Sequence, residues 1–149
     1  MTARHFTWIS KVSAAAVALA AAGCFGAPAS LTGQVRIEES LRAQLQPSAV
    51  LYVVARSVAG PDAQPSPPLA VKRIPQPIGF PLQFTLTEAD VMIPNTPFRG
   101  KVEVSARVAQ SGSAVPLQAG DLESGAAPIV VELGPRVSAV ELVLDRVRN

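Results

Sequence analysis

Apolar and polar residues alternate along several segments of this chain, most clearly in residues 101–108. The even-numbered positions from Val102 to Val108 are apolar, and the odd-numbered positions from Lys101 to Arg107 are polar. A period of two residues is typical of a β-strand with one buried face. This pattern, together with runs rich in Val, Leu and Ile, predicts seven strands. They cover residues 34–38, 49–56, 69–74, 82–87, 101–108, 129–133 and 139–147.

The predicted strands differ in how many faces they bury. In residues 82–87 and 139–147 the alternation places side chains such as Phe84 and Leu142 inward, with polar residues between most of them. Residues 49–56 are apolar on both faces, as expected of a central strand. Met92 lies beside Val91 and Ile93, and we expect it to fill part of the core.

Proline and glycine separate these strands. All 14 prolines of the chain follow residue 24, and residues 60–68 and 114–128 are predicted to be loops. Residues 39–47 favour at most one helical turn, and residues 88–90 favour a turn. The sequence therefore predicts an all-β chain. Its length and strand count fit an immunoglobulin-like β-sandwich of about seven strands.

The first 23 residues have a different composition. Arg4, His5 and Lys11 precede an apolar run of small residues at 12–22. A basic start followed by a short apolar run is typical of a secretory signal peptide. The run is shorter than the roughly 20 residues that a membrane helix needs.

Cys24 ends this run, within the sequence Leu-Ala-Ala-Ala-Gly-Cys-Phe-Gly at 19–26. Gly followed by Cys at this place resembles a bacterial lipobox, although Ala21 stands where Leu is commoner. We therefore predict a lipoprotein signal peptide at 1–23, a lipid-modified Cys24, a tether at 24–32 and the β-sandwich domain at 33–149. Phe25, where Asp would favour the inner membrane, favours the outer membrane. The alternative is ordinary secretion, with cleavage after Ala27 or Ala29.

Charge and residue types exclude several functions. Two of the 13 basic residues precede Cys24 and none of the 11 acidic ones does, so the mature chain has a formal charge of zero. With no basic cluster beyond the pair Lys72-Arg73 and no aromatic residue placed for stacking, nucleic-acid binding is not expected. His5 is the single histidine and Cys24 the single cysteine. The mature chain thus lacks residues for a His-containing triad or a His- or Cys-ligated metal, and we expect no enzyme activity and no cofactor.

Two arginines stand out in the strands. Arg56 and Arg107 each follow an alanine in a strongly predicted strand. Each is a candidate contact for a protein partner, or half of an ion pair with a loop carboxylate such as Asp121. Asp121 and Glu123, in a Gly-rich loop, are expected to be solvated or to cap backbone N–H groups.

Several blocks occur in an order that resembles a known family. They are Leu-Tyr-Val-Val-Ala-Arg at 51–56, Pro-Leu-Ala-Val-Lys-Arg at 68–73, Phe-Pro-Leu-Gln-Phe-Thr-Leu at 80–86, Met-Ile-Pro at 92–94, Val-Ser-Ala-Arg-Val-Ala-Gln-Ser-Gly-Ser-Ala at 104–114 and Gly-Asp-Leu-Glu at 120–123. From about Leu31 to Val147 the chain resembles the C-terminal periplasmic domain of the cytochrome c biogenesis family CcmI/CycH. In that family the immunoglobulin-like domain follows two membrane helices and a helical repeat region that captures apocytochrome c.

The resemblance implies an immunoglobulin-like fold and a link to envelope assembly, with no catalytic residue. Neither preceding region of the family is found before the matched blocks, so a lipid tether would take the place of the membrane helices. The expected function is a non-enzymatic envelope lipoprotein that binds another envelope protein, such as the cytochrome c maturation machinery. The alternative is a structural or ligand-binding surface lipoprotein of unrelated role.

Overall fold

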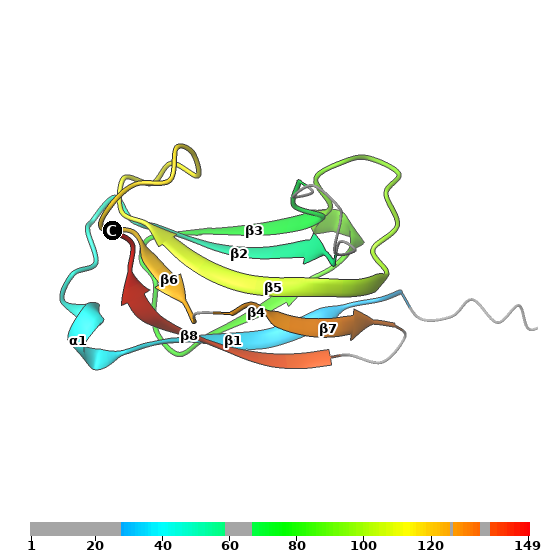
Figure 1. The fold of residues 1–149 in the computed structure, drawn as a ribbon, viewed down its shortest axis with the longest axis horizontal. Coiled ribbons are helices and arrows are strands. Elements are labelled where there is room, and N and C mark those ends of the chain that lie inside the picture. Colours follow the sequence, from blue (N-terminus) through cyan, green and yellow to red (C-terminus); the bar gives the residue numbers. More distant parts are fainter. Residues whose placement is uncertain (1–27, 59–66, 126, 135–137) are drawn as a thin grey trace, which may run out of the picture.

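The computed structural model describes residues 28–58, 67–125, 127–134 and 138–149. The predicted signal peptide, Cys24 and most of the predicted loop at 60–68 lie outside the described residues. The elements, in chain order, are β1 (Leu31–Ile37), α1 (Glu39–Arg42), β2 (Val50–Ser57), β3 (Ala70–Pro75), β4 (Leu82–Leu86), the 3-10 turn η1 (Glu88–Asp90), β5 (Gly100–Ala109), β6 (Leu122–Ser124), β7 (Ile129–Leu133) and β8 (Ser138–Val147). The prediction of an all-β chain is confirmed (Figure 1).

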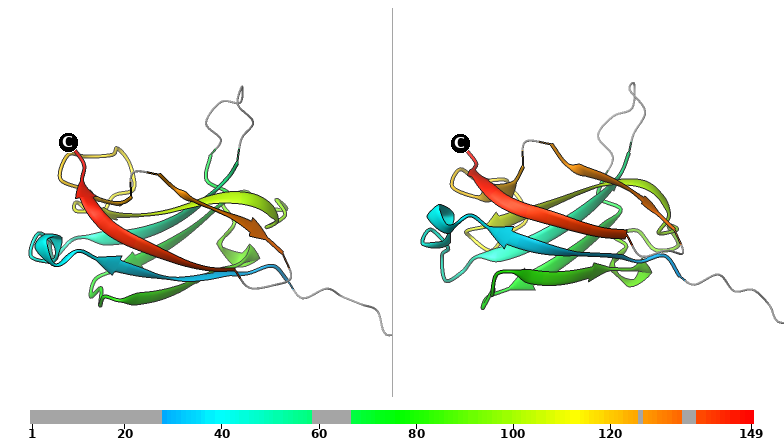
Figure 2. Two further views of the ribbon diagram at one scale, coloured as in Figure 1. Left: turned by 60° about the horizontal axis from the view of Figure 1, so that its bottom comes forward. Right: turned by 90° about the horizontal axis from the view of Figure 1, so that it is seen from below.

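The strands form one hydrogen-bonded sheet in the order β3-β2-β5-β6-β8-β1-β4, and β7 pairs with β5. The pair β1–β8 is parallel and the other pairs are antiparallel. The sheet rolls into a barrel-like shape in which β2, β3 and β5 lie opposite β1, β4 and β8 (Figures 1 and 2). A bridge between Ala70 and Val91 brings the two ends of the order together.

This arrangement differs from a sandwich of two separate sheets. The ten-residue strand β5 pairs with β7 along its first half and with β6 near its end. Strand β6 in turn pairs with β8, so the ladder of hydrogen bonds continues from one layer into the other. The all-β prediction therefore holds, whereas a two-sheet sandwich is not what the hydrogen bonding shows.

The core lies inside the rolled sheet, and the alternating positions fill it as predicted. Every even-numbered side chain from Val102 to Val108 is at most 2% exposed. Phe84 and Leu86 of β4 are buried, as are the alternate positions of β8 from Val140 to Leu144. Burial of apolar side chains in this way is the main favourable contribution to folding.

Three details differ from the sequence prediction. Strand β6 lies within residues 114–128, which the sequence assigns to a loop, because a three-residue strand is too short to show a period. Strand β1 begins at Leu31, so Gly33 lies inside it rather than before it. The prediction that Met92 fills the core is wrong: Met92 is 58% exposed, because its N–H donates to the carbonyl of Leu69 and the chain runs along the surface there.

The helices of the described part are short. The α-helix α1 has four residues and η1 has three. Within residues 28–58, 67–125, 127–134 and 138–149, no helix has the length and apolar character needed to cross a bilayer.

Candidate functional site

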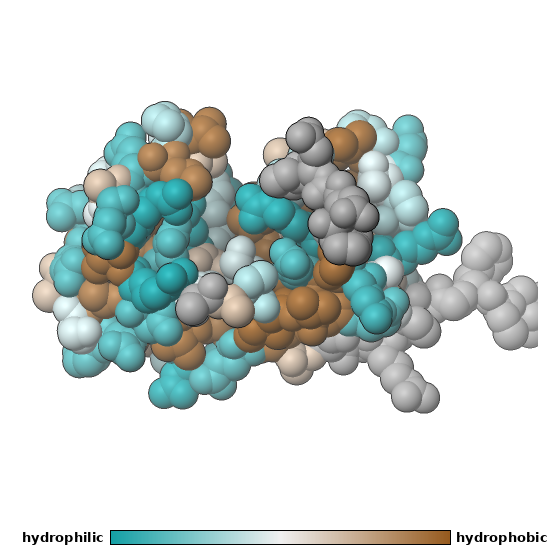
Figure 3. All heavy atoms as spheres, viewed as in Figure 1, coloured by the Kyte–Doolittle hydropathy of each residue, from teal (hydrophilic) through white to brown (hydrophobic). Residues whose placement is uncertain are grey.

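A groove of about 900 Å³ lies on the outer surface of the sheet, over β3, β2 and β5. We call it the outer groove. One wall is formed by Ala114, Val115 and Leu117 of the β5–β6 loop, and the facing side carries Pro68 and Met92. Figure 3 shows a hollow between two raised parts of the surface, with brown, apolar residues on both. The groove thus combines a strand floor with loop walls.

The floor of the outer groove is apolar because β2 is apolar on both faces. Leu51, Val53 and Ala55 belong to the main core. Tyr52 and Val54, between them, face outward and form a second small cluster with Val71 and other neighbours. The two-faced apolar pattern of residues 49–56 therefore has two causes, the core beneath the sheet and the groove above it.

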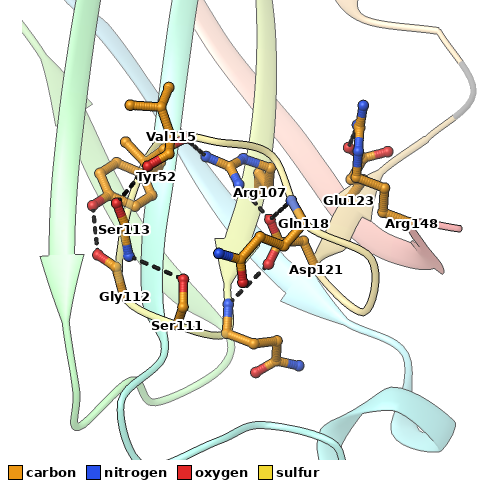
Figure 4. Close-up of polar contacts among 12 residues, drawn as sticks. Tyr52, Arg107, Ser111, Gly112, Ser113, Val115, Gln118, Asp121, Glu123 and Arg148 are labelled. Atoms are coloured by element: carbon orange, nitrogen blue, oxygen red, sulfur yellow. Dashed lines mark hydrogen bonds and ion pairs between the residues drawn. The ribbon is translucent and has the colours of Figure 1, made fainter.

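Arg107 connects the floor to the loop wall (Figure 4). Its Nη1 lies 2.5 Å from Oδ2 of Asp121, and its Nη2 donates to the carbonyl oxygen of Ala114 at 2.5 Å. The guanidinium also lies 5.7 Å from the centre of the Tyr52 ring, within cation–π range. The Arg107 side chain is only 14% exposed, so these contacts account for most of its surroundings.

Asp121 holds the β5–β6 loop against the sheet. Besides Arg107, its carboxylate accepts hydrogen bonds from the backbone N–H groups of Gln110, at 3.0 Å, and Gln118, at 3.3 Å. Asp121 is 1% exposed, and among the described residues it is the one charged side chain that is buried. The Tyr52 hydroxyl adds a bond to the carbonyl oxygen of Gly112 at 2.9 Å. The loop wall is therefore built into the fold.

The outer groove carries more positive than negative charge. Its lining includes five arginines, namely Arg56, Arg73, Arg107, Arg146 and Arg148, against Glu103 and Glu123. Glu123 is shared by Arg148, which donates to it, and Arg146, at 3.9 Å. Arg56 and Arg73 are exposed and form no ion pair with any residue that the structure describes.

The structure brings the two arginines chosen from the sequence into one groove. For Arg107 it shows the ion pair with Asp121 that was one of the two interpretations. For both arginines a contact with a partner stays a prediction, as does the modification of Cys24. The sequence reasoning missed the loop wall, for which the apolar sequence Ala-Val-Pro-Leu at 114–117 was an available signal.

The carboxylates of the turns accept hydrogen bonds from backbone N–H groups or form ion pairs with basic side chains. Asp121 caps backbone N–H groups as expected, and Asp90 accepts from the N–H of Thr87 at 2.9 Å and pairs with Lys72 at 3.0 Å. Among the described residues no group of three or more His, Cys, Asp or Glu side chains is arranged to hold a metal ion.

Comparison with known proteins identifies a family to which the chain is similar. The cytochrome c-type biogenesis protein CycH of Pseudomonas aeruginosa is 36% identical over 87 residues, which are 57% of this chain and 20% of that protein. The chain thus spans about a fifth of the length of this relative. A solved structure of an alternative pilotin from the type II secretion system of Vibrio cholerae aligns with a TM-score of 0.49 and 22% identity. The alignment covers 77% of this chain and 93% of the pilotin.

The family model of the cytochrome c-type biogenesis protein H Ig-like domain matches residues 31–145, which are nearly all of the described part. This match confirms the resemblance that the sequence blocks indicated. The chain belongs to the family of the Ig-like domain of cytochrome c-type biogenesis protein H.

Proposed function

We propose that this chain is a non-enzymatic protein of the cell envelope that binds another envelope protein during the maturation of c-type cytochromes. The family match over residues 31–145 carries the proposal. A relative that shares 36% identity with the chain is named as a cytochrome c-type biogenesis protein. Since the chain covers a fifth of that relative, the proposal concerns the part that this domain plays.

The absence of an enzymatic role is supported by the residue inventory. The one histidine and the one cysteine both lie in the first 24 residues. In the described part, the most buried carboxylate, Asp121, is committed to a loop and to Arg107. A carboxylate with three donors around it has a structural role already and is poorly placed to act as a general base.

The proposal includes a lipid tether at Cys24 that faces the periplasm, in the outer membrane rather than the inner one. Its support is the order of basic, apolar and small residues before Cys24, and Phe25 after it. Two or three acyl chains hold a protein firmly, since each buried CH₂ contributes about 0.8 kcal/mol.

Deletion of the gene tests the role in maturation. We expect c-type cytochromes, measured by haem staining of envelope proteins, to fall in the deletion strain and to return when the full chain is supplied. Cross-linking in intact cells, followed by mass spectrometry, should identify a component of the maturation machinery. Normal c-type cytochromes together with no such component would remove this role and leave a structural or ligand-binding surface protein.

A further inference from the structure

The outer groove joins two features that seldom occur together on a surface without a partner. Its floor and walls expose apolar side chains, and arginines stand among them. Val115 is 74% exposed, Met92 58% and Leu117 51%. Isolated exposed apolar residues are ordinary, but a concave set with polar groups beside it is typical of an interaction site. The groove therefore needs an occupant that satisfies both features.

The charge of the groove indicates the chemistry of the occupant. Arg107, Arg146 and Arg148 are paired with carboxylates of the same domain. Arg56 and Arg73 form no ion pair with any described residue, although Glu103 lies opposite Arg56 in the β2–β5 ladder, and both arginines are in strands that form the floor. They directly adjoin the apolar positions Val54 and Val71. A ligand with carboxylates beside apolar groups is complementary to this surface.

The shape of the groove favours a segment of protein over other acidic partners. Figure 3 shows the hollow as open to solvent, whereas a small-molecule site encloses most of its ligand. A flat lipid surface would touch the raised walls and leave the floor empty. An extended or helical segment presents apolar and charged side chains at alternating positions, which is how grooves commonly recognise peptides.

We propose that the outer groove docks an acidic segment of a partner protein that also carries apolar side chains. Arg56 and Arg73 contact its carboxylates, and the floor at Val54 and Val71 contacts its apolar side chains. Val115 and Leu117 contact it from the loop wall, which Asp121 and Arg107 hold in place. This inference rests on the proposed function, because it takes the partner to be a protein.

Peptide selection on the full chain, purified from membranes in detergent, tests the proposal. A random library of displayed peptides is selected on the chain, and enriched sequences are synthesised with a fluorescent label. We expect enriched peptides to combine Asp or Glu with Leu, Val or Phe, and their affinity to fall as NaCl is raised. Enrichment of basic peptides, or of none, overturns the proposal.

Charge reversal locates the site. Arg56→Glu and Arg73→Glu should each weaken binding of an enriched peptide by about tenfold, since each change replaces attraction by repulsion. Arg99→Glu is the matched control. It alters an exposed arginine outside the groove lining and should leave affinity unchanged. Equal losses in all three variants, or no loss in the first two, contradict docking in the groove.

A second pair of variants tests the apolar contact without disturbing the core. Val115→Ser and Leu117→Ser alter exposed residues and should weaken binding while the thermal unfolding curve stays the same. Vesicles containing phosphatidylglycerol serve as the other acidic ligand. Binding to these vesicles that depends on Arg56 and Arg73, with no peptide binding, would assign the groove to lipid and overturn the proposal.

These results are separable from those of the deletion strain. Peptide binding that depends on Arg56 and Arg73, with normal c-type cytochromes in the deletion strain, retains the groove as a docking site and removes the maturation role. Reduced cytochromes without acidic peptide binding retain the role and remove the groove.

Discussion

Asp121 shows how one residue holds a loop against the sheet. A buried charge is unfavourable unless it is paired and hydrogen-bonded, and Asp121 has both an arginine and two backbone donors. The backbone around it is also bonded: the N–H of Arg148 donates to its carbonyl oxygen at 2.8 Å. The loop wall of the groove and the C-terminal end of β8 therefore meet at this residue.

Asp121→Asn should lower the free energy of unfolding by about 3 kcal/mol, because it leaves the mostly buried Arg107 without its countercharge. Urea unfolding, followed by far-ultraviolet circular dichroism, measures this change. Glu141→Gln is the control, since its pair with Arg36 is about half exposed and should contribute less than about 1 kcal/mol. Equal effects of the two substitutions would contradict a structural role for the buried pair.

The sequence predicts part of the arrangement around Arg107 and Asp121. The alternation in residues 101–108 places Arg107 on the outer face, and a pairing with Asp121 could be proposed from it. The burial of Asp121 could not be predicted. Its donors at Gln110 and Gln118 are brought together by the path of a loop, and the loop sequence has no periodicity. The outward orientation of Met92 also could not be predicted from hydropathy, since Val91 beside it packs against the core and the N–H of Met92 binds the carbonyl of Leu69.

Strand β1 depends on a residue without a side chain. Gly33 is opposite Val140 of β8 on one side and Phe84 of β4 on the other. A Cβ atom at Gly33 would lie 2.4 Å from the carbonyl oxygen of Val140 and 2.7 Å from the Phe84 ring. Both neighbours are part of the sheet or the core, so β1 can lie this close to them only with glycine here.

Gly33→Ala should therefore lower the free energy of unfolding by about 2 kcal/mol, as overpacking in a core commonly does. Gly79→Ala is the matched control, because a Cβ atom there meets no atom within 4 Å, and its effect should stay within about 0.5 kcal/mol. Chemical unfolding of both variants gives the comparison. A Gly33→Ala protein as stable as the control would show that the two neighbours move apart easily.

Most strands can be recognised from the sequence, and β2, β3 and β7 lie within one residue of their predicted ranges even without a clear alternation. Strands β4, β5 and β8 lie within a residue or two of their predicted ranges, because each alternates over at least five residues. Strand β6 has three residues, of which only Leu122 is buried, so its composition resembles that of a loop. Strand β6 forms because it pairs with β5 on one side and β8 on the other, and these neighbours are present only in the assembled sheet.

The whole molecule combines a rolled sheet, a groove on one face and a proposed tether. The sequence predicts seven of the eight strands, with β6 assigned to a loop, and it does not give the order of the strands in the sheet. The pairing of β1 with β8 joins residues such as Gln34 and Glu141, which are 107 positions apart. Continuity of hydrogen bonds between the two layers likewise arises from β6, which pairs with both β5 and β8, and no single segment contains that information.

The tether is tested by changing its attachment residue. We expect Cys24→Ser to abolish labelling with palmitate and to release the chain from membranes into the soluble envelope fraction. Phe25→Asp is the companion variant, which should keep the label and move the chain toward the inner membrane. Retention of Cys24→Ser in the membrane at the wild-type level would show that a different feature holds the chain there.

The parallel pairing of β1 and β8 also governs when this chain can become a folded protein. Strand β1 can pair with β8 only after residues 138–147 have been synthesised, and contacts so distant in sequence form slowly. Until then β1 presents an unpaired edge, the kind of surface on which chains aggregate or are held by chaperones. A chain that is cut or stalled before Ser138 therefore keeps that edge of β1 open.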